Sequence, residues 1–425
     1  MLTVEENDLI TKTGPETPMG GLFRRFWLPV LLADELPGPD SPPVRVEVLG
    51  ERLVAFKDTE GRIGFLDRRC PHRQVDLFWG RNEEGGLRCV YHGWKFDVDG
   101  SCLDIPNALE GETFRDKIKT FAAYPGLEAG GLVWVYMGPK ALKPELPGME
   151  WLRLPPSHRY VSKIMLRANY LQLMEGDMDS SHVGFLHSKA DGGYGATELQ
   201  SRLQQQMFVD KMPRWELKPT DYGIMLGARR EGDNGEASWR VNQWLMPSFT
   251  MIAAKPGAPP LIQLRIPVDD ENSMFIRVVW HPTRPLSDKE MYQYRDAGIF
   301  FPELIPGTFT PKENMDNDYL MDRAMQRSYS FTGIKSIPAQ DFAVQENQGG
   351  GPLMDRSNEH LVSSDTAIIN VRRRLIQTAI NLQEGQEPLE PVGVAAANVR
   401  AVDIALGSDE VVWDGAREYL EARSW

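Results

Sequence analysis

Two short Cys/His motifs constrain this chain more than any other feature. Cys70 and His72 form C-x-H, and after a gap of sixteen residues Cys89 and His92 form C-x-x-H. Each motif offers one thiolate and one imidazole, which suits a two-iron cluster with two Cys on one iron and two His on the other. A Cys₂His₂ zinc site is the alternative, although zinc sites more often open with C-x-x-C. The spacing therefore favours a [2Fe–2S] cluster.

The composition is that of an ordinary globular protein. The 425 residues are 41% hydrophobic and 25% charged, which is enough chain for two or three domains and a large core. The net charge of −13 argues against nucleic acid as a partner, because phosphate binding needs clustered Lys and Arg.

The number of cysteines and the lack of long apolar runs indicate where in the cell the protein is expected. Two of the three cysteines belong to the motifs, which leaves Cys102 alone and no disulfide framework. The opening MLTVEENDLI lacks the apolar stretch of a secretory signal, and no run approaches the ~18 apolar residues of a membrane span. We therefore expect a cytoplasmic protein without a membrane partner.

Residue patterning divides the chain into three parts. Residues 1–36 are expected to form a helical lead-in, and residues 37–148 a small all-β domain of short alternating strands. Both Cys/His motifs fall on loops between those strands. Prolines concentrated in residues 139–156 mark a boundary, beyond which residues 149–425 are expected to form a second domain.

The second domain is predicted to contain an antiparallel sheet flanked by helices. Turn-like stretches separate strand-like runs at residues 224–228, 239–245, 261–266 and 274–280. Helical segments are expected at residues 166–187, 312–330 and 366–383. The predicted fold class is therefore α+β.

A second group of metal-binding side chains lies in the segment NYLQLMEGDMDSSHVGFLH, where Asp179 and His182 precede His187. Two imidazoles and a carboxylate with open positions are the set that non-haem Fe(II) oxygenases use. The two histidines, five residues apart, lie about 140° apart on a regular helix, so they converge only if the helix ends, bends or bulges. Gly184 would permit this. Core histidines on an amphipathic helix are the alternative, which the upstream cluster motifs disfavour.

Five segments resemble the α subunits of Rieske non-haem iron ring-hydroxylating oxygenases, most of all those of the phthalate 4,5-dioxygenase type. They are PMGGLFRRFWLPVLL, CPHRQVDLFWGR, CVYHGWKFDVDGSC, NYLQLMEGDMDSSHVGFLH and AQDFAVQENQGGGPLMDRSNEHLVSSD. The resemblance spans nearly the whole chain. It implies a small all-β Rieske [2Fe–2S] domain, followed by an α+β catalytic domain of the helix-grip type that binds mononuclear Fe(II).

The resemblance also implies roles for individual residues. His182 and His187 match the two histidine ligands of the mononuclear iron. Asp179 matches an aspartate that links an iron-ligating histidine to a cluster histidine of the neighbouring subunit, and so bridges electron transfer between subunits.

The third iron ligand implied by the resemblance is a carboxylate far downstream, and Asp341 in AQDFAVQE is the best positional match. A helix N-cap is the alternative role for Asp341, because Asp is common ahead of a helical run. Asp355 and Asp365 are the other candidates for the ligand, although both fit surface or turn positions better.

Residues that contact the substrate are less well indicated. The resemblance favours an aromatic carboxylate as the substrate. The two parallel N–H donors of an arginine match the two oxygens of a carboxylate, and Arg214 and Arg240 lie near the predicted sheet. Ser180 beside the iron-binding segment is a further candidate for substrate binding. Asn169 and Gln172 are candidates for groups that orient the ligands.

The implied function is the terminal oxygenase component of a multicomponent system. It would use O₂ and electrons from NADH, delivered by a separate flavin/iron–sulfur reductase and possibly a ferredoxin, to hydroxylate an aromatic carboxylate. A homotrimer or a stacked hexamer is implied. Monooxygenation or O-demethylation of a methyl- or methoxy-substituted aromatic acid is one alternative, and an electron-transfer protein without oxygenase activity is another.

Overall fold

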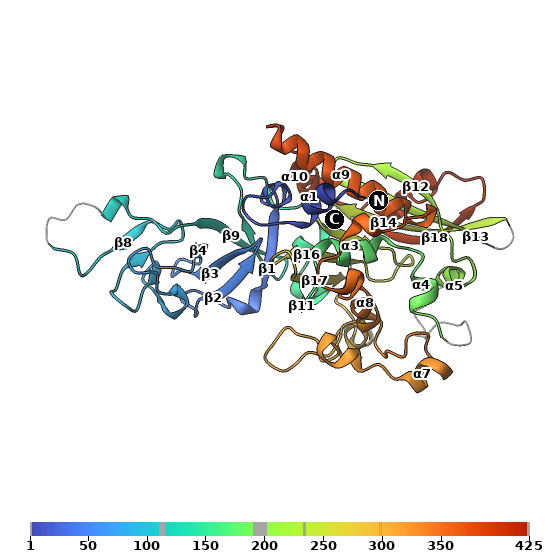
Figure 1. The fold of residues 1–425 in the computed structure, drawn as a ribbon, viewed down its shortest axis with the longest axis horizontal. Helices are drawn as coiled ribbons and strands as arrows, with labels where there is room; N and C mark the ends of the chain where they lie inside the picture. The colour runs from blue at the N-terminus through green and yellow to red at the C-terminus, as the bar shows by residue number, and fades with distance from the viewer. Residues whose placement is uncertain are drawn as a thin grey trace.

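The computed structural model describes residues 2–109, 115–189, 202–232, 235–296, 298 and 300–422. The molecule is elongated, with one group of strands at one end and a larger sheet with helices at the other (Figure 1). Every strand pairing within its three sheets is antiparallel.

The chain begins with two short helices, α1 (Val4–Thr11) and α2 (Pro18–Phe23). Thr3 caps α1 and Thr17 caps α2, each by accepting a hydrogen bond from the third residue of its helix. The predicted lead-in of residues 1–36 is therefore helical only in part. Residues Trp27–Leu32 form β1, an almost fully buried strand of the first sheet, because WLPVLL is too apolar to remain outside the core.

The N-terminal part consists of two small sheets. The six-stranded sheet has the order β1-β10-β9-β4-β3-β2, and the four-stranded sheet the order β5-β6-β7-β8. Their strands are β2 (Val44–Val48), β3 (Glu51–Lys57), β4 (Ile63–Asp67), β5 (Arg81–Glu83), β6 (Gly86–Arg88), β7 (Lys95–Phe96), β8 (Cys102–Asp104), β9 (Ala123–Ala129) and β10 (Leu132–Tyr136). The predicted all-β domain is confirmed.

The C-terminal part is built on an eight-stranded sheet with the order β11-β17-β16-β15-β14-β13-β12, in which β18 pairs with β14. The strands are β11 (Arg159–Leu166), β12 (Arg214–Pro219), β13 (Gly223–Glu231), β14 (Glu236–Leu245), β15 (Phe249–Ile252), β16 (Leu261–Pro267), β17 (Ser273–Trp280) and β18 (Val402–Gly407). The four predicted strand-like runs correspond to β13, β14, β16 and β17. The α+β class with an antiparallel sheet and flanking helices is confirmed.

Helices in the second part accompany this sheet, and α9 lies beside α1 and α2 (Figure 1). They are α3 (Tyr170–Met178), α4 (Val183–Leu186), α5 (Arg202–Val209), α6 (Asp288–Met291), α7 (Arg323–Ser328), α8 (Ile337–Gln345), α9 (Thr366–Gln383), α10 (Glu390–Ala396), α11 (Val412–Gly415) and α12 (Arg417–Leu420). Helix α9 has the predicted bounds. The other two predicted helical segments are interrupted: residues 166–187 contain α3 and α4, and residues 312–330 contain a 3₁₀ segment, Met315–Leu320, followed by α7.

One apolar core continues from the first sheet into the large sheet, since it includes Val133 and Trp134 as well as Ile262 and Leu264. A separate small core underlies the Cys/His loops, and both motif cysteines belong to it. Among the described helices, none has the length and apolar character that crossing a membrane requires.

Candidate active site

The two Cys/His loops have the same backbone design. In each loop the cysteine amide donates to the carbonyl five residues on, Cys70 to Val75 and Cys89 to Trp94. The residue four positions after each cysteine returns a hydrogen bond to that cysteine's carbonyl. These residues are Gln74 and Gly93, and both have a positive φ, 59° and 77°. Two equivalent tight loops therefore face one another, each presenting one thiol and one imidazole.

The side chains of these loops suit a buried cluster with an exposed edge. Cys70 and Cys89 are only 2% and 3% exposed, whereas His72 and His92 are partly exposed. The two imidazole rings lie 4.4 Å apart, and Trp94 stacks on His72. A hydrogen bond between the two thiols lowers the pKa of Cys89, so one thiolate forms readily. This donor set fits a two-iron cluster with mixed thiolate and imidazole ligands.

The second group of candidate ligands forms where the helical chain breaks. Helix α3 ends at Met178, Asp179 is extended, and the single-turn α4 begins only at Val183. His182 precedes α4 and His187 follows it, so the condition that the helix must end or bend between the two histidines is met. The helix ends at Leu186, between the two histidines, and Gly184 lies inside α4. A separate break at residues 179–182 divides α4 from α3.

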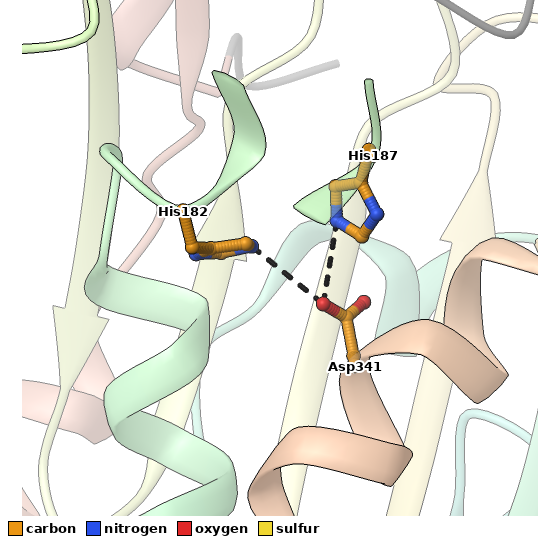
Figure 2. Close-up of side chains that lie close together, drawn as sticks. All are labelled: His182, His187 and Asp341. Carbon is orange, nitrogen blue, oxygen red and sulfur yellow. Dashed lines mark ion pairs between the residues drawn. The ribbon is translucent and has the colours of Figure 1, made fainter. Parts of the chain in front are cut away.

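Helix α8 brings Asp341 to the two histidines, and Figure 2 shows both rings facing its carboxylate. The Nε2 atom of His187 lies 3.3 Å from Asp341 Oδ1, and that of His182 lies 3.6 Å from the same oxygen. One potential ligand atom from each residue lies within 4.8 Å of the others. Asp341 is in the middle of α8, whose N-cap is Ser336, so the alternative of a helix cap is wrong.

Hydrogen bonds on the far side of each imidazole leave the facing nitrogen free for a metal. His187 Nδ1 donates to Gln340 Oε1 at 2.8 Å, and His182 Nδ1 lies 3.5 Å from Asp179 Oδ2. Donation from Nδ1 fixes the tautomer in which Nε2 carries a lone pair. Asp341 Oδ1 is buried and accepts no hydrogen bond among the described residues. Such an orphaned carboxylate oxygen beside two imidazole nitrogens fits a divalent metal such as Fe(II).

Gln340 holds the ring of His187 and is itself fixed, because its amide donates to the carbonyl of Ile334 at 2.8 Å. We predict that Gln340→Leu weakens iron binding at the His187 site by about 10- to 100-fold, the range typical for such supporting groups. Competition with an iron chelator measures this directly. Gln377→Leu on the exposed face of α9 is the matched control and should leave iron affinity unchanged.

Asn169 and Gln172 support the fold around α3 and do not touch the candidate ligands. The Asn169 amide caps α3 and donates to the carbonyls of Thr11 and Asp270. Gln172 donates to the carbonyl of Gln345 and accepts from the amide of Met354. These contacts do not support the prediction that Asn169 and Gln172 orient ligands, because both side chains form hydrogen bonds with backbone groups outside the candidate iron site.

The predicted substrate residues separate into two that lie away from the candidate iron site and one that faces it. Ser180 is buried and accepts a hydrogen bond from Arg230 at 3.0 Å, and it does not line the cavity described below. Arg214 is half-exposed and lies 3.5 Å from the carboxylates of Asp210 and Glu231. Arg240 does line the cavity.

The two other candidates for the carboxylate ligand have turn roles. Asp355 accepts a hydrogen bond from the amide of Ser357, and Asp365 accepts one from the amide of Val362. Both side chains cap short 3₁₀ segments, as the sequence favoured. Neither belongs to the group formed by His182, His187 and Asp341.

A cavity of about 220 Å³ opens beside the three candidate ligands. Its apolar walls come from the large sheet and from the helices around it. They include Val183, Phe208, Ile252, Leu261, Phe275 and Phe342. Such a space, with apolar walls and a few polar groups, is typical of a site for a small aromatic molecule.

Three arginines line this cavity, and two of them were not selected from the sequence. Arg265 on β16 and Arg277 on β17 interrupt the mostly apolar strands LIQLRIP and SMFIRVVW, and that interruption is the signal that could have found them. The Arg265 guanidinium pairs with Asp177 at 2.6 Å. Arg240 on β14 lies 3.3 Å from Asp403, its partner across the strand pair with β18.

Comparison with protein families gives two adjacent matches. The family described as "Rieske [2Fe-2S] domain" matches residues 26–122, and the family described as "LigXa C-terminal domain like" matches residues 135–411. The first match includes all four residues of the Cys/His loops. The second includes His182, His187 and Asp341.

Curated relatives match along almost the entire chain. The phthalate 4,5-dioxygenase oxygenase subunit of Pseudomonas putida is 34% identical over 100% of this chain and 96% of its own. The 3-chlorobenzoate-3,4-dioxygenase oxygenase subunit of Comamonas testosteroni is 36% identical over 92% and 91%. The 5,5'-dehydrodivanillate O-demethylase oxygenase subunit of a Sphingobium strain is 31% identical over 99% and 91%.

Solved structures show the same fold at lower sequence identity. NdmA of Pseudomonas putida CBB5, in a mutant form with theobromine, matches with a TM-score of 0.60 at 19% identity. The match covers 92% of this chain and 99% of that one.

Proposed function

The chain belongs to the Rieske non-haem iron oxygenases, and on that premise we propose that it hydroxylates an aromatic carboxylate with O₂ and electrons delivered by a separate reductase. The relatives that support this substrate class are the oxygenase subunits of phthalate and 3-chlorobenzoate dioxygenases. The single observation that carries the proposal is the opening of an apolar cavity directly beside His182, His187 and Asp341.

The proposal assigns metal-binding roles to both groups of residues. Cys70, His72, Cys89 and His92 would hold the [2Fe–2S] cluster, while the three residues beside the cavity would hold the mononuclear iron. When bound, the cluster relays single electrons and the mononuclear iron activates O₂ for attack on the substrate.

The chain's own residues then have three tasks around the iron site. Gln340 and Asp179 hold the two imidazoles so that Nε2 faces Asp341. Burial alone would raise the pKa of Asp341, but the positive charge of His187 and His182 when they are protonated lowers it, so the carboxylate stays ionised. Phe275 and Phe342 supply apolar wall that excludes water and packs against an aryl ring.

The separation between the Cys/His loops and the iron-site helices within one chain supports a proposal about how subunits assemble. The strands next to the Cys/His loops, such as β4 and β8, lie in one half of the molecule, whereas α4 and α8 lie in the other half (Figure 1). We therefore propose a homotrimer or stacked hexamer in which Asp179 of one subunit adjoins the cluster loops of the next, and bridges the two sites. The hydrogen bonds from the amides of Ser181 and His182 hold Asp179 in place for that role.

The electron donor in this proposal is a flavin/iron–sulfur reductase that oxidises NADH, acting directly or through a ferredoxin. All three relatives are oxygenase subunits, a term that implies a separate component for electron supply. A cytoplasmic location, where NADH is available, is part of the same proposal.

O-demethylation of a methoxy-substituted aromatic acid is the second candidate function. The observation that favours it is the 31% identity, over 99% of this chain, to the 5,5'-dehydrodivanillate O-demethylase oxygenase subunit. The same iron ligands and the same apolar cavity serve both reactions, so the position of the substrate in the cavity decides between them.

Turnover of a substrate panel tests the proposed function. Holoenzyme, a flavin/iron–sulfur reductase and NADH are incubated under O₂ with phthalate, 3-chlorobenzoate, vanillate and their uncharged amides. We expect a hydroxylated product from at least one acid, with formaldehyde released in place of a diol if the reaction is demethylation. Oxidation of the amides but of no acid would refute the proposed substrate class.

A further inference from the structure

Arg277 differs from the other two arginines of the cavity because its guanidinium makes no ion pair with any described residue. Its Nη1 atom donates to the backbone carbonyl of Phe300, and its Nε atom is buried without an acceptor among the residues that the structure describes. Arg240 and Arg265 each form an ion pair, whereas Arg277 forms none within the described part of the chain. A buried donor of this kind costs folding free energy, so an acceptor that arrives with a ligand would offset that cost.

The neighbours of Arg277 cannot serve as that acceptor, because each is already engaged. Asp177 accepts both nitrogens of Arg265, at 2.6 and 3.0 Å, and also the hydroxyl of Thr250. Asp341 faces the two histidines. The pKa of Arg277 is lowered to about 10 by its burial and by Arg265, so the guanidinium stays charged at neutral pH.

The surroundings of Arg277 also favour a flat, apolar ligand with an anionic end. Phe275 lies two residues before Arg277 on β17, and its ring centroid is 5.1 Å from the guanidinium carbon. Arg265 stacks on the same ring at 3.7 Å. Two arginines therefore hold the Phe275 ring at the cavity wall, so that an aryl group and a carboxylate could bind side by side.

Lys255 is the other cavity-lining cation that has no ion pair among the described residues. It is less suited to fix a carboxylate, because an ammonium on a flexible stem lacks the planar pair of donors that matches two carboxylate oxygens. Lys255 also has no orphaned buried nitrogen of the kind found on Arg277.

We propose that Arg277 binds the carboxylate of the aromatic substrate and so orients the ring toward the site formed by His182, His187 and Asp341. This inference rests on the proposed function, since it names the residue that selects acids over neutral aromatics. Arg277 would then replace Arg214 and Arg240, the two arginines selected from the sequence, as the carboxylate anchor.

Binding to the anaerobic holoenzyme tests the inference without relying on turnover. Calorimetry compares benzoate, 3-chlorobenzoate and phthalate with their amides, in wild type and in Arg277→Gln. For the acid that wild type binds most tightly, we expect Arg277→Gln to lose at least about 30-fold in affinity, the scale for truncating one partner of a buried charge pair. Affinity for the matching amide should change less than about threefold. Arg277→Lys should fall between wild type and Arg277→Gln, because it keeps the charge and loses the fork.

Two controls separate the role of Arg277 from a general loss of charge or fold. Arg284→Gln removes a half-exposed arginine that pairs with Glu290 at 2.8 Å, and should bind the acid as wild type does. Lys255→Met removes the other unpaired cavity cation and should keep most of the preference for acids. An unchanged visible spectrum of the cluster in each variant shows that the protein has folded.

The binding results distinguish failure of the role of Arg277 from failure of the proposed function. If wild type binds an acid and Arg277→Gln binds it equally well, or if only Lys255→Met loses the preference for acids, the role of Arg277 is overturned while the proposed function stands. If wild type binds none of the acids, the proposed substrate class fails and this inference fails with it.

Discussion

Replacing His187 by Ala is expected to remove the mononuclear iron while leaving the cluster in place. His187 contributes one of three converging ligand atoms, and a two-ligand remnant would hold Fe(II) weakly. Turnover should fall by more than about 100-fold, since even loss of a group that only supports a ligand costs 10- to 100-fold. Metal analysis should show one iron fewer per chain, and the red-brown colour should persist. His182→Ala should behave in the same way.

His158→Ala is the matched control for these histidine variants. His158 is partly buried, and its Nδ1 atom lies 3.2 Å from the carbonyl of His281, outside the candidate ligand group. Its loss should leave the iron content and turnover unchanged. An iron content in His187→Ala equal to that of wild type, together with retained turnover, would show that the mononuclear iron binds elsewhere.

Replacing Glu175 by Ala is expected to cause the largest loss of stability. Glu175 lies on α3 and pairs with Arg356 at 3.1 Å and Arg372 at 2.6 Å, and all three side chains are at most 7% exposed. Its removal leaves two buried guanidiniums without this shared carboxylate, which costs about 3–5 kcal/mol in comparable buried pairs. Urea denaturation of cluster-loaded protein, followed by tryptophan fluorescence, measures the change in unfolding free energy.

Glu387→Ala provides the comparison for this prediction. Glu387 pairs with Arg25 at 2.6 Å, but its side chain is 44% exposed, so its loss should cost no more than about 1 kcal/mol. Equal destabilisation by the two variants would contradict the view that burial makes the Glu175 network important for folding.

The parts of the site that were predictable from sequence lie in short local motifs. Cys70, His72, Cys89 and His92 are recognisable because a cluster loop needs its ligands within a few residues of each other. His182 and His187 could be paired in the same way. Asp341 is distant in sequence, and only its match to a family pattern pointed to it.

The parts that were not predictable depend on contacts between strands and helices that are far apart in sequence. Arg277 reaches the cavity because β17 lies between β11 and β16, whereas Arg240 and Asp403 neutralise one another because β18 returns to pair with β14. A single strand does not show which of its arginines will meet a carboxylate. Gln340 was missed for a similar reason, since its role depends on how the fold brings α8 to His187, which lies 153 residues earlier in the chain.

The strands of the fold were also predictable only in part. Alternating or apolar runs such as β13, β14, β16 and β17 were predicted, because their burial is visible along the strand. β1 was assigned to a helical lead-in because its six buried or partly buried residues carry no strand periodicity. β12 was missed because RWELKP lies at a sheet edge and is mostly exposed.

The central claim is that one chain holds two separate iron centres, and metal analysis of anaerobically purified, fully loaded protein tests it most directly. Iron and acid-labile sulfide are measured on the same sample, in wild type and in His187→Ala. The account predicts that wild type contains one iron per chain beyond the pair that the sulfide accounts for, and that His187→Ala contains the pair alone. Wild-type protein that holds only the sulfide-matched pair would contradict it.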